Sequence, residues 1–226
     1  MSNSAGVVVD ELRQACAGMQ TLVDGVRPAQ WGSPTPCSEW DARALLNHVV
    51  FGNRSFTSIL HGDPAPPQEQ IRTMRDRDYL GDDPAAAWRD SADGLLAAFT
   101  GPEVLGREFR SPLGPLPGAG LARLRITETL VHGWDLARAT GQSAPFPQEI
   151  VEATLSFTRR QLVRRVGAIG PAVRRRTAGG RGRSTPGSAR GSAGSRRRMT
   201  ADPSSTEVIL AAVDAQREAD LGRWVM

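Results

Sequence analysis

The sequence contains no lysine, since all 28 of its basic residues are arginines. This absence excludes every mechanism that needs a lysine nucleophile, a Schiff base or the phosphate-binding lysine of a P-loop. Only two cysteines are present, Cys16 and Cys37, and they form neither a CxxC motif nor a disulfide framework. One tyrosine and six phenylalanines accompany five tryptophans, a set more typical of a core than of a base-stacking surface.

Long apolar runs are also absent, and no stretch approaches the length needed to span a bilayer. Residues 1–10 lack the basic start and the apolar core of a signal peptide. We therefore expect a soluble cytoplasmic protein with reduced thiols and no membrane partner. Motifs for a serine nucleophile elbow, a Walker A loop and a dinucleotide-binding loop are missing too, so those enzyme classes are not predicted.

The positive charge of the chain is concentrated in one segment. Residues 174–198 hold nine arginines and no acidic residue, while the rest of the chain carries 19 arginines against 24 acidic residues. The body of the protein is therefore mildly acidic, and the formal charge of +4 is poor evidence for nucleic-acid binding.

Apolar residues at three- and four-residue steps predict helices along most of the chain. The expected helices cover about residues 7–26, 38–60, 84–99, 119–140 and 147–166. A capping pattern formed by Ser38 and Asp41 starts the second helix, and Gly141 ends the fourth. Residues 63–83 are expected to be a long loop with some helical turn, and residues 101–118 a proline-rich crossover loop that can hold a short extended piece. The predicted fold class is all-α, an antiparallel four-helix bundle with an extra C-terminal helix and a disordered Arg-rich tail.

That tail begins where the character of the chain changes, after residue 173. Residues 174–198 have no apolar side chain larger than alanine, so they cannot bury enough surface to become ordered. Three interpretations stay open: an arginine-rich arm for nucleic acid, a solvated linker, and the product of a reading-frame change in a GC-rich gene, which the absence of lysine favours. Residues 199–226 regain a weak helical pattern and are predicted as a short C-terminal helical segment.

Two histidines occupy the middle of predicted helices, where they can carry chemistry. His48 lies in the second helix and His132 in the fourth. Glu128 precedes His132 by four residues, so the two side chains share one helix face, and Asp135 lies on the same stripe. The third histidine, His61, is close to a helix end and is interpreted as a surface residue.

Glu128 and His132 at this spacing can chelate one divalent metal, and His48 from a facing helix would complete three protein ligands. Two histidines and one glutamate with an open position form a known catalytic zinc (Zn²⁺) arrangement, and Ni²⁺, Fe²⁺ or Mn²⁺ also suit these donors. The alternative is a simple surface hydrogen bond between Glu128 and His132. The apolar flanks of both histidines favour the metal, because burying these groups unpaired is costly. Cys37 is interpreted as a small residue of the capping loop rather than as a reactive thiolate.

Two sequence blocks carry a family resemblance: TPCSEWDARALLNHVVFGN (Thr35–Asn53) and LRITETLVHGWDLARATGQ (Leu124–Gln142). They resemble the DinB-like metal-binding superfamily, and more narrowly the actinobacterial branch related to the N-terminal domain of mycothiol-dependent maleylpyruvate isomerase. The resemblance covers about residues 5–173, which it marks as a DinB-like bundle domain. It implies one divalent metal, often zinc, held by His48, Glu128 and His132, and an acid at Asp135 that orients His132 through its other ring nitrogen.

The resemblance has a limit at the C-terminus. Residues 174–226 do not match the usual ending of the family, and nothing here resembles the additional C-terminal domain that helps to complete the active site of the isomerase. No residue is therefore predicted as a general acid or base.

Two function classes follow from these observations. The first is a metal-dependent transferase or isomerase that uses a small-molecule thiol, mycothiol, as cosubstrate and acts on an electrophilic substrate. The alternative is a non-catalytic, metal-stabilised bundle that serves as a binding or stress-response module. A homodimer through an exposed bundle face is compatible with both.

Overall fold

The computed structural model describes residues 3–38, 40–63, 68–101, 103–111 and 114–160. The chain divides into two compact units, residues 1–154 and 155–226, and only residues 155–160 of the second unit are described. The predicted tail and the predicted C-terminal segment therefore lie outside the described residues. Within the described ranges, no helix is both long and apolar enough to cross a membrane.

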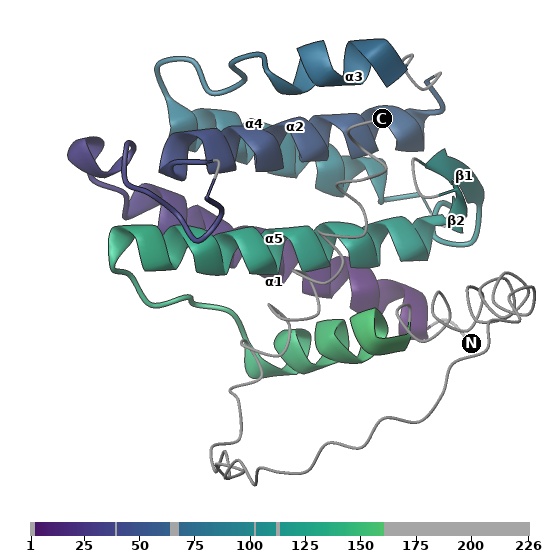
Figure 1. The fold of residues 1–226 in the computed structure, drawn as a ribbon. Coiled ribbons are helices and arrows are strands. Elements are labelled where there is room, and N and C mark those ends of the chain that lie inside the picture. Colours follow the sequence, from purple (N-terminus) through teal and green to yellow (C-terminus); the bar gives the residue numbers. More distant parts are fainter. Residues whose placement is uncertain (1–2, 39, 64–67, 102, 112–113, 161–226) are drawn as a thin grey trace, which may run out of the picture. The chain divides into compact units, whose positions relative to one another are not determined.

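Four long helices form the first unit, which confirms the predicted all-α fold. They are α1 (Asn3–Asp24), α2 (Ala42–His61), α4 (Pro84–Ala98) and α5 (Gly118–Thr140). In Figure 1, α1 and α5 run in one direction, and α2 and α4 run in the other. An ion pair between Glu11 and Arg123 joins α1 to α5, and α2 packs against both α4 and α5. The neighbouring helices α2 and α5 are therefore antiparallel and pack against each other.

The connection between α2 and α4 contains a further short helix, α3 (Gln68–Arg75), in the stretch predicted to have some helical turn. Figure 1 shows α3 lying along α2 as the chain returns to the end at which α4 begins. Pro84 opens α4 at a first helical position, where its missing N–H costs nothing. This return brings the residues after α3 close to the middle of α2.

The start of α2 differs from the sequence prediction. Ser38 does not cap this helix; Asp41 is its N-cap, and the Asp41 side chain accepts a hydrogen bond of 2.8 Å from the backbone N–H of Ala44. The reason is that the chain before Asp41 is held in a folded loop, in which the N–H of Ala42 bonds back to the carbonyl of Ser33. The loop after η1 (Pro28–Gln30) therefore covers the first turn of α2 instead of extending it.

The proline-rich stretch between α4 and α5 forms an antiparallel hairpin of β1 (Glu108–Ser111) and β2 (Gly114–Pro117). Its residues do not alternate cleanly between apolar and polar, so the sequence pattern predicted no more than a short extended piece there. Phe109 is the buried residue of β1 and lies opposite Leu116. Gly118 is the first residue of α5. Only glycine fits at this position, because a Cβ there would lie 2.1 Å from the carbonyl oxygen of Val104.

The core of the first unit lies between the four long helices. Its largest fully buried side chains are Trp88, Leu12, Met19, Leu22, Leu45, Leu46, Leu95, Leu121, Ile126 and Leu136. α5 stops at Gly141, as predicted, and this C-cap residue adopts a left-handed conformation with φ of 71°. Residues 148–160 are helical, which confirms the fifth predicted helix over its described part, while residues 161–166 lie outside the description.

Phe146 holds the end of α5 against α1. Its ring lies so close to two glycines that an added Cβ would approach it to 2.4 Å at Gly133 and to 2.7 Å at Gly18. Any larger residue at Gly133 must therefore displace a packed aromatic ring, directly beside His132 in the sequence.

We expect Gly133→Ala to lower the free energy of unfolding by about 1–3 kcal/mol, because the new methyl group overpacks the contact with Phe146. Gly94→Ala is the matched control: Gly94 is also helical, but its Cβ would meet nothing within 4 Å. That control should gain roughly 0.5–1 kcal/mol through helix propensity. Urea unfolding measures both changes, and equal effects of the two substitutions would refute the proposed packing role of Gly133.

Candidate metal centre

The structure brings together the three side chains that the sequence predicted as metal ligands. α2 supplies His48, and α5 supplies Glu128 and His132. The Nε2 atom of His132 lies 3.4 Å from Oε2 of Glu128, and the Nε2 atom of His48 lies 3.7 Å from the same oxygen. All three potential ligand atoms lie within 4.8 Å of one another. Metal binding by this set stays a prediction, but its geometric requirement is present.

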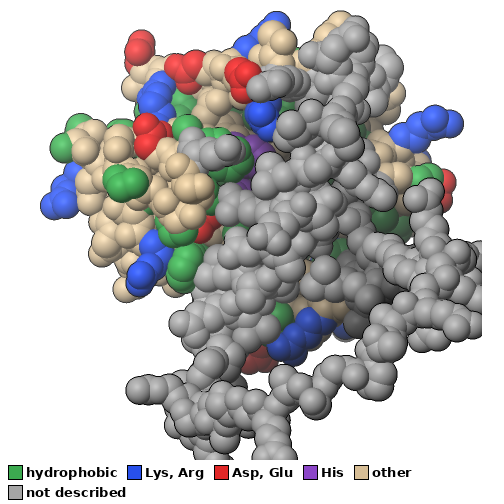
Figure 2. Space-filling view, viewed as in Figure 1, with side chains coloured by type: hydrophobic (Ala, Val, Ile, Leu, Met, Phe, Trp, Pro, Cys, Tyr) green, Lys and Arg blue, Asp and Glu red, His purple; other side chains and the backbone are tan. Residues whose placement is uncertain are grey.

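The three side chains differ in their contact with solvent. The side chain of His132 is 6% exposed, that of His48 is 26% exposed, and that of Glu128 is 43% exposed. The group therefore has an inner imidazole and an outer carboxylate. Figure 2 shows histidine surface on this face of the molecule, with acidic and basic side chains nearby. His61, in contrast, is exposed at the last residue of α2, as expected.

Electrostatics couple the three groups tightly. Desolvation alone would raise the pKa of Glu128, but hydrogen bonding to His132 and His48 outweighs it and holds that pKa well below its ordinary value. Burial lowers the pKa of His48. Burial opposes the charged form of His132 as well, yet its hydrogen bonds, led by that with Asp135, hold the pKa of His132 well above the ordinary value. Glu128 is thus ionised and faces two imidazole nitrogens.

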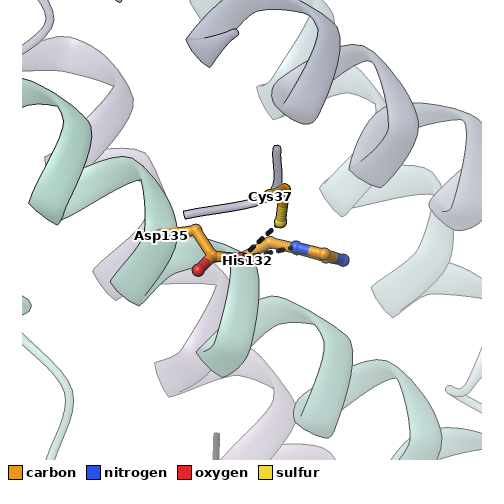
Figure 3. Close-up of side chains that lie close together, drawn as sticks. All are labelled: Cys37, His132 and Asp135. Atoms are coloured by element: carbon orange, nitrogen blue, oxygen red, sulfur yellow. Dashed lines mark hydrogen bonds and ion pairs between the residues drawn. The ribbon is translucent and has the colours of Figure 1, made fainter. Parts of the chain in front are cut away.

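Asp135 lies against the inner imidazole, where the resemblance led us to expect it, and its orienting role stays a prediction. Its Oδ2 atom lies 3.2 Å from Nδ1 of His132 and also accepts a hydrogen bond of 3.0 Å from the thiol of Cys37 (Figure 3). With Nδ1 occupied by Asp135, the Nε2 atom of His132 is the one that faces Glu128. The sequence pattern suggested only a capping-loop role for Cys37, so this contact between residues 98 positions apart was missed.

Trp40 is a second residue that sequence reasoning did not single out. Its ring stacks on that of His48, with centroids 4.5 Å apart and planes inclined by 28°. Its centroid also lies 5.9 Å from that of His132. Trp40 directly precedes the N-cap of α2, and the folded loop lays its ring on His48, which lies about two turns further along that helix.

A cavity of about 250 Å³ adjoins this group. It is lined by Trp40, Ala44, Asn47, His48, Arg75 and Asp76. Since His48 belongs both to the cavity wall and to the predicted ligand set, a small molecule in the cavity would lie beside the candidate metal site. Arg75 and Asp76 contribute charged groups to the wall on the α3 side.

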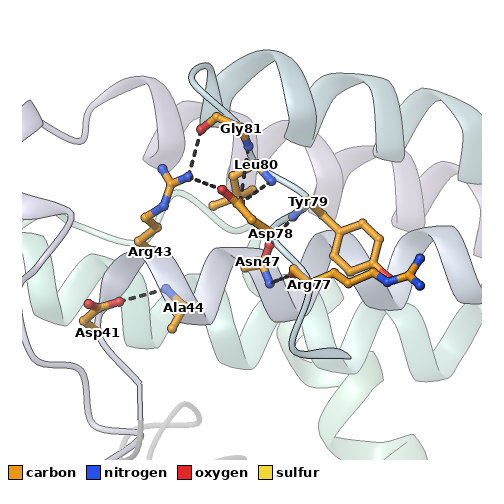
Figure 4. Close-up of polar contacts among 9 residues, drawn as sticks. All are labelled: Asp41, Arg43, Ala44, Asn47, Arg77, Asp78, Tyr79, Leu80 and Gly81. Carbon is orange, nitrogen blue, oxygen red and sulfur yellow. Dashed lines mark hydrogen bonds and ion pairs between the residues drawn. The ribbon is translucent and has the colours of Figure 1, made fainter. Parts of the chain in front are cut away.

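A network of polar contacts fixes that wall of the cavity (Figure 4). The side-chain amide of Asn47 donates to the carbonyl of Arg77 at 2.8 Å, and its oxygen accepts from the N–H of Tyr79 at 2.7 Å. Arg43 bonds to the carboxylate of Asp78 at 2.9 Å and to the carbonyl of Gly81 at 2.8 Å. These contacts hold the chain after α3 against α2.

Arg125, one turn before Glu128, is a buried cation with 2% exposure. Its Nη2 atom donates to the side-chain oxygen of Asn53 at 2.8 Å, and no described carboxylate lies within ion-pair distance of it. Gly52 makes room for the guanidinium, because a Cβ there would lie 2.6 Å from Nη1. Burial lowers the pKa of Arg125, and the negative charge of Glu128 opposes that shift. Arg125 thus adds positive potential close to the candidate site.

Comparison with known families gives this site a context. Residues 12–137 match the family model described as the mycothiol maleylpyruvate isomerase N-terminal domain. The chain belongs to this family. The match to the mycothiol maleylpyruvate isomerase N-terminal domain includes the whole first block and residues 124–137 of the second. It therefore covers His48, Glu128 and His132, together with Cys37 and Asp135.

The chain is also similar to individual proteins and to solved structures. Uncharacterized proteins from two strains of Mycobacterium tuberculosis are 36% identical over 138 residues, which is 61% of this chain and 70% of each relative. A crystal structure of the mycothiol-dependent maleylpyruvate isomerase aligns with a TM-score of 0.55 and 19% identity over 67% of each chain. A histidine-to-alanine mutant of that isomerase gives the same TM-score with 18% identity. At these identities, the two solved structures show a shared fold.

Proposed function

We propose that this protein is a divalent-metal-dependent enzyme that uses a small-molecule thiol, mycothiol, either to transfer the whole thiol to an electrophilic substrate or to isomerise that substrate. The observation that carries the proposal is the convergence of His48, Glu128 and His132 from two helices. Membership of a family whose model is described by a mycothiol-dependent reaction supports the choice of thiol. Both cysteines are buried thiols, which suits the reducing cytoplasm in which we place this function.

The residues present fit a divalent metal. Two imidazole nitrogens and one carboxylate oxygen are the donor set of open catalytic zinc sites, and the same set accepts Ni²⁺, Fe²⁺ or Mn²⁺. The three ligand atoms are already close, so few side-chain movements are needed to hold an ion. When bound, the ion would act as a Lewis acid that lowers the pKa of a thiol presented to it.

The charges around the site favour an anionic ligand. A divalent ion and the guanidinium of Arg125 would face the two carboxylates of Glu128 and Asp135, which leaves one unit of positive charge. This excess of positive charge favours a thiolate over a neutral ligand. The protein needs no thiol of its own for this purpose.

Neighbouring side chains position the two imidazoles, and the adjoining cavity has room for the reactants. Asp135 holds the ring of His132, and Trp40 stacks on His48 and so restricts the second imidazole. The cavity beside His48 offers an aromatic wall at Trp40 and charged groups at Arg75 and Asp76. We assign this cavity to the small-molecule reactants. The homodimer through an exposed bundle face stays a separate prediction.

The proposal is tested with purified full-length protein, by elemental analysis followed by a thiol-transfer screen with mycothiol and a panel of electrophiles. We expect about one equivalent of metal and turnover that requires both the thiol and the metal, because the three ligands form one site. Chelated protein and protein without thiol serve as controls. Turnover that persists after complete chelation would contradict the proposal.

A second candidate function is the non-catalytic, metal-stabilised bundle. A specific feature favours it: Cys37, His132 and Asp135 form another group of potential ligands, and all three are buried. Buried ligand sets without an open position are typical of structural sites. Stoichiometric metal without turnover in the same screen would favour this candidate.

A further inference from the structure

Cys37, Asp135 and His132 form a buried series of hydrogen bonds. The three candidate ligands His48, Glu128 and His132 alone do not account for the presence of Cys37 in it. It joins the loop before α2 to the inner imidazole on α5. Cys37 and Asp135 are 4% and 1% exposed, and His132 is 5% exposed, so water competes little for these groups. Two donors thus converge on one carboxylate in a poorly solvated place.

Both donors use the same oxygen. The thiol of Cys37 lies 3.0 Å from Oδ2 of Asp135, and Nδ1 of His132 lies 3.2 Å from that oxygen. The hydrogen bond from the thiol restricts the orientation of the carboxylate. The same oxygen is thereby held in position to accept the N–H of the imidazole. The Nε2 atom of His132 is then the one that faces Glu128, and its lone pair would serve an ion once that nitrogen has lost its proton.

The loop presents the thiol rigidly. The backbone N–H of Cys37 donates to Oγ1 of Thr35 at 3.1 Å, and the hydroxyl of Thr35 lies 2.7 Å from the carbonyl of Trp40. The N–H of Trp40 returns to the carbonyl of Cys37 at 2.8 Å. The same short loop therefore places Trp40 over His48 and directs Cys37 to Asp135.

We propose that Cys37 is a positioning residue of the metal centre: its S–H bond to Asp135 fixes the carboxylate that sets the tautomer and ring orientation of His132. The inference rests on the proposed metal site. In this role Cys37 is a hydrogen-bond donor and not a ligand of the ion; it acts on the ion only through Asp135 and His132.

The test compares Cys37→Ala and Cys37→Ser in the full chain, with Cys16→Ala as the matched control. Cys16 is also 4% exposed, but it lies on α1, and burial raises its pKa to about 12, so it is an inert core thiol. Zinc affinity is measured by competition with a chromogenic chelator, and unfolding of the metal-free proteins in urea is measured in parallel.

We expect Cys37→Ala to weaken zinc binding roughly 10- to 100-fold, the usual cost of removing a group that supports a metal ligand. Cys37→Ser should stay within a few-fold of the wild type, because a hydroxyl donates to the same carboxylate. Cys16→Ala should bind zinc like the wild type even if it unfolds more easily. Should the alanine variant fail to fold, Cys37→Val removes the donor without leaving a cavity.

Each other outcome overturns a distinct statement. Wild-type affinity in Cys37→Ala, or equal weakening in the alanine and serine variants, would refute the positioning role while leaving the metal site intact. A thiolate-to-cobalt charge-transfer band in the Co²⁺-substituted wild type would make Cys37 a ligand instead. Failure of the wild type to bind any divalent metal would refute the proposed function together with this inference.

Discussion

Replacing His48 with alanine is expected to abolish stoichiometric zinc binding. His48 supplies the only predicted ligand from α2, so its loss leaves Glu128 and His132, which lie on one helix and cannot surround an ion. The loss of affinity should exceed the roughly 10- to 100-fold cost of removing a supporting residue. Elemental analysis after dialysis measures the metal content directly.

His61→Ala is the matched control for this substitution. His61 is on the same helix, but it is exposed at the C-terminal end of α2. The control should retain the metal content of the wild type, with thiol-dependent turnover unchanged. A His48→Ala protein that keeps a full equivalent of zinc would show that the assigned ligand set is wrong.

Removal of the metal should lower the stability of the bundle strongly. An ion that binds only the folded state stabilises it by about 4 kcal/mol when its free concentration is a thousandfold above Kd. For a domain of this size, that corresponds to a shift in Tm of roughly 8–16 °C. The physical reason is that His48 and Glu128 converge only when α2 and α5 are packed. Differential scanning calorimetry with added zinc and after chelation measures the shift.

The His48→Ala protein provides the reference for that experiment. Its Tm should not respond to the same zinc concentrations, because the chelating set is incomplete. An equal zinc-dependent shift in both proteins would mean that the ion binds elsewhere, for example at the buried group of Cys37, His132 and Asp135.

The helices and the candidate ligands that converge could be predicted from sequence because they depend on local patterns. The periodic apolar residues defined the four long helices, and Gly141 marked the end of α5 through its preference for a left-handed conformation. Glu128 and His132 share a face by their four-residue spacing alone. His48 was the one mid-helix histidine on another helix, so the choice of the third ligand needed no tertiary information.

The supporting contacts could not be predicted in this way, because they join segments far apart in the chain. Cys37 and Asp135 are 98 residues apart, and Asn47 bonds to Tyr79 across 32 residues. The misplaced start of α2 has the same origin. Ser38 has a capping side chain, but the tertiary fold of the loop assigns the cap to Asp41.

X-ray absorption spectroscopy of the zinc-loaded protein, before and after addition of mycothiol, tests the central claim most directly. The predicted first spectrum contains two imidazole nitrogens at about 2.0–2.1 Å and oxygen ligands, with no sulfur, and the thiol then adds one sulfur at about 2.3 Å. A shell without imidazole nitrogens, or one that contains sulfur before any thiol is added, would contradict a site built from His48, Glu128 and His132.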